Sequence, residues 1–198
     1  MTDPGAAGLR ERKKARTRRA IQEQAMRLFL AKGYATTTVQ EIAAAAGVSH
    51  MTFFRYFPTK EDVVMADEYD PLIMELVRAR PAGEPDVERI RHALLAGLTA
   101  VSAADRQALL DRTRLVLGTP ALRARLWENQ VQTEALLLRA LGPDGGEEAG
   151  LQRRVLVAGC LAAVTTALLV WVERDGKPDL PGLVEQAFGA LRAELAAS

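Results

Sequence analysis

The chain has a single cysteine, Cys160, and only two histidines among its 198 residues. One cysteine excludes a disulfide framework within the chain and leaves no zinc-site spacing, so a reducing, cytoplasmic compartment fits. His50 and His92 are not paired with Cys160 in sequence, and no nucleophile or metal motif accompanies them. We therefore expect no enzyme, no metal site and no cofactor.

Aromatic residues are also scarce, at 5%, and runs of β-branched residues are few, whereas alanine and leucine are abundant. This composition favours helices over strands. A hydrophobic content of 48% with 26% charged residues is ordinary for a soluble globular protein, and the chain is long enough to bury a substantial core. The expected fold class is all-α.

The net charge of +1 hides an uneven distribution along the chain. Residues 1–60 contain eleven Lys and Arg against four Asp and Glu, a net +7, whereas residues 61–198 contain fifteen against twenty-one, a net −6. A basic first third indicates a polyanion-binding module, and the acidic remainder indicates a body that does not bind polyanions. The alternative is a basic N-terminal tail that is only solvated.

Residues 37–57, TTVQEIAAAAGVSHMTFFRYF, are typical of two short helices joined by a tight turn. Thr38 and Glu41 have the spacing of a capping box, and Gly47 suits the left-handed position that ends a helix. Ser49 can then cap the second helix. Helix, glycine turn and helix form the geometry of a helix-turn-helix DNA-binding motif.

The second of these helices has two faces. Phe53 and Phe57 are four residues apart and are expected to face the core. The side chains expected to point away from the core are His50, Met51, Thr52, Arg55 and Tyr56.

Before this motif, the sequence predicts a disordered tail at residues 1–9 and a long helix over residues 10–32 that stops at Gly33. The first turns of the helix, RERKKARTRR, are too charged to present an apolar face. This basic run is either a solvated helix face or a set of phosphate or minor-groove contacts.

After the motif, a helix is expected from residue 60 to about 80, with a kink or a break at Pro71. Residues 81–86, PAGEPD, have the composition of a linker, and residues 142–150 that of a flexible loop. The remaining helices are expected at 86–103, 105–117, 120–141, 151–174 and 180–196. The whole layout contains nine helices.

The helix at 151–174 contains a run of seventeen positions without charge, residues 156–172. The run is at the lower limit of length for a membrane span and is diluted by small residues, so we expect a buried helix and no membrane partner. Small residues that allow another helix to approach closely recur at Gly159, Ala163 and Ala167, and at Ala158, Ala162 and Thr166.

The final helix offers a matching apolar seam, formed by Leu180, Val184, Ala187, Leu191 and Leu195. Helices 151–174 and 180–196 from each of two chains would form an intermolecular four-helix bundle. A homodimer through these helices also suits a DNA-binding protein that reads two half-sites. The alternative is that a monomer buries both helices.

Residues 20–62 resemble the N-terminal domain of the TetR family of transcriptional regulators, through AIQEQAMRLFLAKGYATTTVQEIAAAAGVS and HMTFFRYFPTKED. The resemblance implies an all-α homodimer with a helix-turn-helix DNA-binding domain at 10–60 and a ligand-binding and dimerisation domain at 61–198. It also implies that the helix at 49–56 binds double-stranded operator DNA.

The DNA-binding residues that the resemblance implies are Thr38, Ser49, His50, Met51, Thr52, Arg55, Tyr56 and Lys60. Thr38, Tyr56 and Lys60 are the expected phosphate contacts. Arg55 is expected to recognise guanine, with a phosphate contact as the alternative, and Met51 to pack on a thymine methyl group. The family usually has Tyr at position 54, where this chain has Phe54 and lacks the hydroxyl group.

Residues 112–142, with LVLGTPALRARLWENQ, resemble the subgroup related to mycofactocin and acyl-CoA-responsive regulators. This implies a small hydrophobic effector, an acyl chain or an acyl-CoA, in an apolar pocket. The expected lining consists of Leu98, Leu110, Arg114, Trp127, Val131, Thr165 and Leu168, and the alternative for each apolar member is ordinary core. We predict a repressor that its effector releases from the operator; the alternative is a ligand-independent regulator or an activator.

Overall fold

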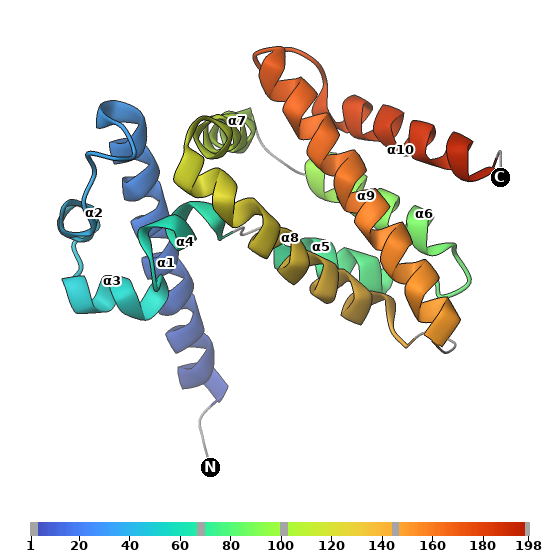
Figure 1. Ribbon diagram of the computed structural model, residues 1–198. Helices are drawn as coiled ribbons and strands as arrows, with labels where there is room; N and C mark the ends of the chain where they lie inside the picture. Colours follow the sequence, from blue (N-terminus) through green and yellow to red (C-terminus); the bar gives the residue numbers. More distant parts are fainter. Residues whose placement is uncertain (1–3, 67–69, 100–102, 144–146, 197–198) are drawn as a thin grey trace. The chain divides into compact units, whose positions relative to one another are not determined.

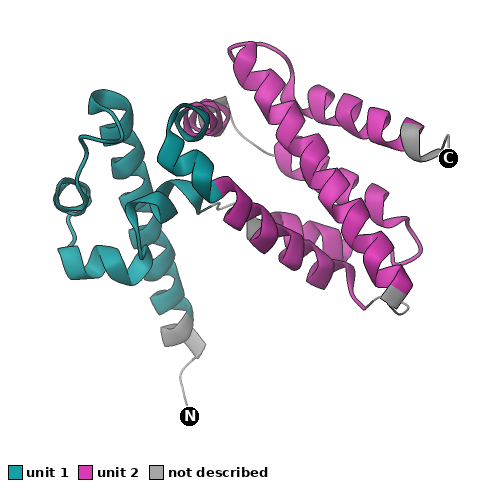
Figure 2. Ribbon diagram, viewed as in Figure 1, with its two compact units in different colours: residues 1–66, 115–125 teal, residues 67–114, 126–198 magenta. Residues whose placement is uncertain are grey.

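The computed structural model describes residues 4–66, 70–99, 103–143 and 147–196, and within them it contains ten α-helices and no strand (Figure 1). The predicted all-α fold is confirmed. The chain divides into two compact units (Figure 2). Unit 1 comprises residues 1–66 and 115–125, and unit 2 comprises residues 67–114 and 126–198.

Unit 1 is formed by α1 (Pro4–Lys32), α2 (Val39–Ala45), α3 (His50–Tyr56) and α4 (Lys60–Met65). It also includes the end of α7 (Ala103–Gly118) and the start of α8 (Pro120–Leu141). α1 packs against α2 and α4, and α2 packs against α3. α1 begins at Pro4 rather than at residue 10, so residues 4–9, expected to be disordered, are helical. Proline is tolerated there because the first residues of a helix have no intrahelical N–H partner.

The helix expected from residue 60 to 80 is divided in two. α4 ends at Met65, and α5 (Asp70–Ala79) follows after a break that includes residues outside the described ranges. Pro71 is the second residue of α5. A proline is accommodated in the first turn of a helix but not in its interior, so a continuous helix through Pro71 is disfavoured. This division accounts for ten described helices where nine were expected.

Unit 2 contains α5, α6 (Asp86–Thr99), most of α7 (Ala103–Gly118) and α8 (Pro120–Leu141), α9 (Glu147–Glu173) and α10 (Leu180–Ala196). α9 packs against α10 and α6, and α6 also packs against α5 and α10. α9 begins at Glu147 rather than at residue 151, which shortens the expected loop at 142–150. The helix expected over residues 86–103 includes residues 100–102, which lie outside the described ranges.

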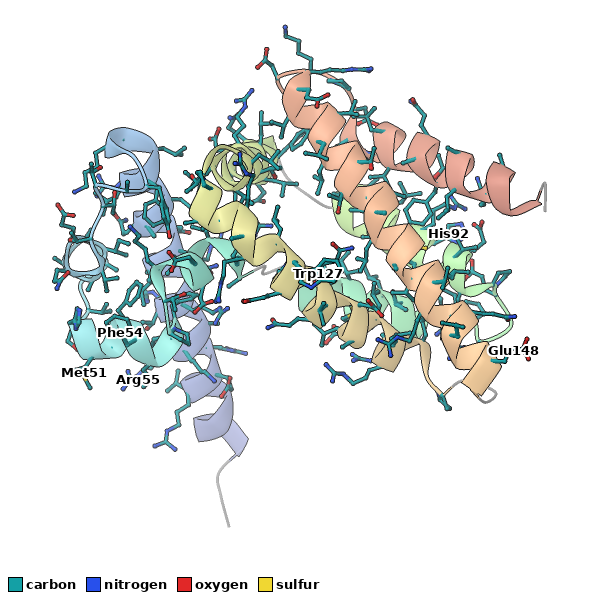
Figure 3. The ribbon with its side chains drawn as sticks, in the orientation of Figure 1. Met51, Phe54, Arg55, His92, Trp127 and Glu148 are labelled. Carbon is teal, nitrogen blue, oxygen red and sulfur yellow. The ribbon has the colours of Figure 1, made fainter. Side chains whose placement is uncertain are left out.

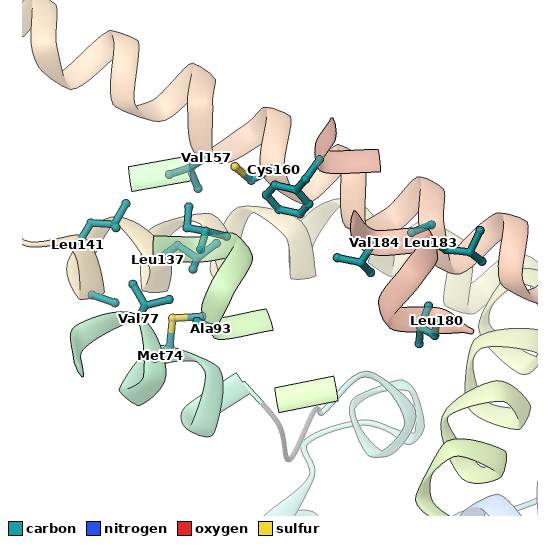
Figure 4. Packing of buried hydrophobic residues seen from close by; sticks show 14 of the residues in the cluster. Met74, Val77, Ala93, Leu137, Leu141, Val157, Cys160, Leu180, Leu183 and Val184 are labelled. Carbon is teal, nitrogen blue, oxygen red and sulfur yellow. The ribbon is translucent and has the colours of Figure 1, made fainter. Parts of the chain in front are cut away.

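The core of unit 2 joins all of these helices (Figure 4). Val157 and Cys160 of α9 and Val184 and Phe188 of α10 are fully or almost fully buried in it. Complete burial of such side chains contributes about 1.5–3 kcal/mol each to the free energy of folding. The core therefore positions α9 and α10 firmly within one chain.

Candidate DNA-binding surface and ligand cavity

The first helix of the helix-turn-helix is capped as its sequence predicts. The Thr38 hydroxyl accepts the N–H of Glu41 at 3.3 Å, and the Glu41 carboxylate accepts the N–H of Thr38 at 2.8 Å. Hydrogen bonds from Lys32, and then from Thr38, lower the pKa of Glu41 to about 2. Gly47 ends the helix with φ +66°, a conformation in which a side chain would be strained. The capping box and the glycine turn are confirmed.

The second helix, α3, is capped by Ser49, whose hydroxyl accepts the N–H of Thr52 at 3.1 Å. Phe53 and Phe57 are buried, as their spacing predicts, and their ring centroids are 6.0 Å apart. These two side chains hold α3 on unit 1 and determine which of its residues face outward.

The outward face of α3 consists of His50, Met51, Phe54 and Arg55, all exposed to solvent (Figure 3). Met51 is 78% exposed, which is unusual for a large apolar side chain. Phe54 packs edge-on against His50, with 4.7 Å between ring centroids. The sequence pattern does not predict Phe54 on this face, where it is 40% exposed.

Thr52 and Tyr56, also expected on this face, are only half-exposed. The Ser49 hydroxyl donates a hydrogen bond to the Thr52 hydroxyl at 2.9 Å, and the guanidinium of Arg55 lies 5.6 Å from the centroid of the Tyr56 ring. Arg55 therefore has a neighbour that orients its side chain along the outward face of α3.

Lys60, an expected phosphate contact, is engaged within unit 1. Its ammonium group donates to the carbonyl oxygens of Tyr34 at 2.9 Å and Thr37 at 3.1 Å and lies above the Tyr34 ring. Two of its three N–H bonds are used in this way. Burial, and then the hydrogen bond to Glu61, raise the pKa of the Tyr34 phenol. These contacts tie α4 to the turn between α1 and α2.

Unit 2 contains an apolar cavity of about 190 Å³. Its lining comes from α5 to α10, and its polar side chains are Arg112 and Thr113 of α7 and Thr133 of α8. Its apolar lining includes Ile73, Leu94, Leu98, Leu109, Leu137, Leu161, Val164, Leu168 and Val184. Such a lining accepts a ligand that is largely apolar and carries few polar groups.

Of the seven residues expected to line a pocket, Leu98 and Leu168 do so, whereas the other five lie outside the lining. Trp127 of α8 is 72% exposed (Figure 3), Val131 of the same helix is 49% exposed, and Thr165 of α9 is also exposed. Their near neighbours Thr133 of α8 and Val164 of α9 line the cavity instead. Each residue turns a helix by about 100°, so a displacement of one or two positions moves a side chain off the cavity.

Leu110 and Arg114, which are also absent from the lining, contact the turn that follows α9. Leu110 is buried, and a Cβ added to Gly176 would lie 2.5 Å from one of its methyl carbons. Arg114 donates to the carboxylate of Asp175 at 3.0 Å. The face of α7 that carries both residues therefore supports this turn, while Leu109, Arg112 and Thr113 face the cavity.

The small residues of α9 fall on two different faces. Gly159 lies against α10 of the same chain, because a Cβ there would meet Leu191 at 3.4 Å. Ala162 and Thr166 are exposed, and the same side of α9 carries the exposed Leu151 and Val155, at 65% and 64%. This exposed apolar stripe is unusual for a surface helix.

The seam predicted for α10 faces its own chain. Leu180 and Val184 are buried in the core of unit 2, and Ala187 and Leu191 are half-buried; the side chain of Leu195 is outside the described part. The outward residues of α10 are Gln186, Ala190 and Ala193. The expectation that the Leu180–Val184 side of α10 faces a second chain is wrong, because α6 and α9 already cover it.

A helix-turn-helix with an exposed recognition helix, joined to a helical unit that holds an apolar cavity, defines a DNA-binding regulator of the kind that responds to a small molecule. Residues 21–66 match the profile of the bacterial regulatory proteins of the tetR family, and residues 84–196 match the MftR C-terminal domain. The chain belongs to the TetR family of bacterial transcriptional regulators, which confirms the resemblance of residues 20–62.

Individual relatives agree with this assignment. The chain is 33% identical to the transcriptional regulator TcmR of Streptomyces glaucescens, over 97% of this chain and 90% of that protein. It is 30% identical to the putative mycofactocin biosynthesis regulator MftR of Mycobacterium tuberculosis, over 93% of each. These relatives are transcriptional regulators rather than enzymes.

Solved structures of similar proteins include fatty-acid regulators. The repressor FadR of Thermus thermophilus, in complex with lauroyl-CoA, is 29% identical, with a TM-score of 0.55 over 88% of this chain and 92% of that one. FadR of Bacillus halodurans is 27% identical, with a TM-score of 0.59 over 88% and 94%.

α9, over Glu148–Glu173, is the one helix among the described residues that is long and apolar enough to cross a membrane by length and composition. The same helix packs against α6 and α10 and carries buried core residues such as Cys160 and Trp171. Central helices of helical proteins share this composition, and the relatives of this chain are transcriptional regulators.

Proposed function

We propose that the chain is a cytoplasmic transcriptional repressor that leaves its operator when a small, largely apolar effector occupies the cavity of unit 2. The cavity is the observation that carries this proposal, because it is largely apolar, is lined by six helices and lies in the unit that does not contain the helix-turn-helix. An effector can shift the equilibrium only by binding the DNA-competent and released forms unequally.

The effector class that best fits the lining is an acyl chain, either free or as an acyl-CoA. The subgroup to which residues 84–196 belong and the lauroyl-CoA bound to the related FadR support this choice. Arg112, Thr113 and Thr133 supply the polar groups of the cavity, and the rest of the lining can accept methylene groups.

The proposed DNA-binding residues lie on α3 and at the starts of α2 and α4. Arg55 and Met51 are exposed and reach the position from which a recognition helix reads bases, and His50 and Thr52 lie in the same turn. Thr38, Ser49 and Tyr56 supply phosphate contacts at the ends of the short helices, and Lys60 supplies one with the N–H bond that the carbonyl oxygens of Tyr34 and Thr37 leave free. Phe54 supplies an apolar contact in place of a hydroxyl group.

The proposed dimer forms through α9 and α10. On α9 the exposed stripe of Leu151, Val155, Ala162 and Thr166 is the surface offered to a second chain, and Ala190 and Ala193 continue it on α10. An apolar stripe of this kind can pack against a second copy of itself across a two-fold axis. A dimer presents two α3 helices to two half-sites of the operator.

Labelling of Cys160 tests the effector part of this proposal. Cys160 is the only cysteine and lines the cavity. Burial raises the pKa of its thiol to about 12, so its modification by methyl methanethiosulfonate should be slow. We expect lauroyl-CoA or laurate to slow it further and, at the same concentration, to release the protein from its own upstream DNA. Protection of Cys160 without release would favour a ligand that does not control DNA binding.

The alternative function is a ligand-independent regulator or an activator, and it would share the same DNA-binding surface. A mobility-shift assay on the upstream DNA, with and without cell extract, separates the two. Retention of DNA binding in the presence of every extract and acyl compound would favour the ligand-independent form.

A further inference from the structure

A second hollow, of about 270 Å³, lies in unit 2 between the end of α6, the first turns of α7 and the start of α10. Leu98, Leu109 and Leu180 line both this hollow and the apolar cavity, so the two spaces share part of their walls. Thr99 and Asp179 of the hollow are exposed, whereas Leu180, at the start of α10, is buried (Figure 4). The hollow therefore opens to solvent at one end and reaches the wall of the cavity at the other.

Arg106 is the cation that the described lining of this hollow contains. Its Nη2 donates to the carbonyl oxygen of Pro178 at 2.8 Å, and its guanidinium carbon lies 5.8 Å from the centroid of the Trp171 ring. The indole N–H of Trp171, a fully buried residue of α9, donates to the same carbonyl oxygen at 3.1 Å. The guanidinium is therefore held in place by two neutral groups, a carbonyl and an aromatic ring.

No acid among the described residues pairs with this guanidinium. Five other buried or half-buried arginines of unit 2 form ion pairs with Asp or Glu at 2.6–3.3 Å, namely Arg80, Arg89, Arg91, Arg114 and Arg153. A half-buried cation without an anion is unfavourable, because it loses part of its hydration and gains no opposite charge. Arg106 thus has both the charge and the free N–H bonds to take an anion from outside the chain.

The other polar groups of the hollow already have partners. The carboxylate of Asp179 accepts the N–H of Gly182 at 2.9 Å, so it caps the N-terminus of α10, whose dipole offsets its charge. The Thr99 hydroxyl donates to the carbonyl oxygens of Leu95 at 2.9 Å and Ala96 at 3.0 Å. Arg106 is therefore the group of this hollow that can donate to an anionic ligand.

We propose that Arg106 binds the anionic end of the effector, a carboxylate or a phosphate group, while the acyl chain of the effector occupies the apolar cavity. This assignment rests on the proposed function, because it concerns the polar end of the same ligand. The chain passes the shared wall of Leu98, Leu109 and Leu180, and rotamer changes of these leucines join the two spaces. The anion stays near solvent, so the apolar cavity does not have to bury a charge.

The test compares the binding of laurate, lauroyl-CoA and neutral 1-dodecanol by the full-length protein, measured by isothermal titration calorimetry. R106Q removes the cation, and R106K keeps the charge but lacks the planar guanidinium fork. R114Q is the matched control, because Arg114 lies two turns further along α7, is half-buried and lines neither space. R112Q tests the arginine that lines the apolar cavity itself. Near-ultraviolet circular dichroism checks that each variant is folded.

We expect R106Q to weaken the binding of laurate and lauroyl-CoA by about 10- to 100-fold, because hydrogen bonds to a charged group are lost. Its affinity for 1-dodecanol should change less than about twofold, R106K should be intermediate, and R114Q should bind all three ligands as the wild type does. A loss for laurate alone would identify the anion as a free carboxylate, and a loss for lauroyl-CoA alone would identify it as a CoA phosphate.

Unchanged affinity of R106Q for both anions would overturn the assignment. An equal loss for 1-dodecanol in a folded R106Q protein would also overturn it, because Arg106 would then only tie α7 to the turn before α10. Weakened anion binding in R112Q with normal binding in R106Q would place the anion inside the apolar cavity instead. If the wild type binds none of the three ligands, the effector part of the proposed function fails, which is a separate result from these.

Discussion

Arg125 donates from its Nη2 to Oδ1 of Asp62 at 2.8 Å, while Oδ2 of Asp62 accepts the N–H of Thr59 at 2.8 Å. One carboxylate therefore both caps α4 and holds the first turns of α8 within unit 1. α8 continues into unit 2, where Thr133 and Leu137 line the cavity. The helix that starts beside α4 is thus one of the six that line the cavity.

We expect R125Q to weaken the coupling between effector and DNA more than DNA binding itself. A partly exposed ion pair contributes about 0.2–1 kcal/mol, so the ratio of operator affinities without and with lauroyl-CoA should fall by about 1.4- to 5-fold. The matched control is R123Q, because Arg123 bonds the carbonyl of Leu117 instead. Equal losses of coupling in the two variants would contradict this route.

T133F should block the cavity. A phenyl ring in place of a hydroxyl group and a methyl group occupies much of a space of about 190 Å³. We expect at least tenfold weaker binding of lauroyl-CoA by calorimetry, with operator binding retained and no release. V131F, on the exposed side of the same helix, should bind the ligand normally. If T133F binds lauroyl-CoA as tightly as the wild type, the ligand lies elsewhere.

V155E should dissociate the proposed dimer. An unpaired carboxylate buried in an apolar interface costs several kcal/mol, so the dimer dissociation constant should rise by more than 100-fold. Sedimentation velocity measures it, and operator affinity should fall in parallel. Q132E, an exposed change of the same charge on α8, should remain dimeric. A V155E protein that still forms dimers would exclude this stripe from the interface.

G176A should destabilise unit 2. Gly176 has φ +69°, and an added Cβ would lie 2.5 Å from a methyl carbon of Leu110. Strain of this kind costs about 1–3 kcal/mol, and differential scanning calorimetry should record a lower Tm. The control G118A has open space around the new methyl group and a negative φ, so its Tm should change little. An unchanged Tm for G176A would mean that the turn relaxes.

Local signals in the sequence were sufficient for the helix-turn-helix, because a capping box and a left-handed glycine depend on residues within a few positions of one another. Thr38 and Glu41 form the expected capping box, and Gly47 has the expected positive φ. The sequence also predicts the apolar helices of unit 2, but it does not predict which face of each helix lines the cavity, the core or the surface. Trp127 is a large apolar residue of the kind that lines cavities, yet its side chain is 72% exposed.

This failure has a physical cause. An apolar side chain packs equally well in a core, in a ligand cavity or against a second chain, and only the packing of distant helices decides among them. Leu180 and Val184 have the pattern of an intermolecular seam, yet α6 and α9 of the same chain bury them. The sequence predicts a kink or a break at Pro71, and the structure has a break, with α4 ending at Met65 and α5 beginning at Asp70.

The most direct test of the account is the affinity of full-length protein for its own upstream DNA, measured by fluorescence anisotropy at several salt concentrations beside R55A. The wild type should bind this DNA more tightly than unrelated DNA, with affinity that falls steeply with salt. R55A should lose about 1–3 kcal/mol of that preference while keeping its binding to unrelated DNA. If the wild type shows no salt-dependent affinity for any DNA, or if R55A keeps the full preference, the assignment of α3 as the recognition helix is contradicted.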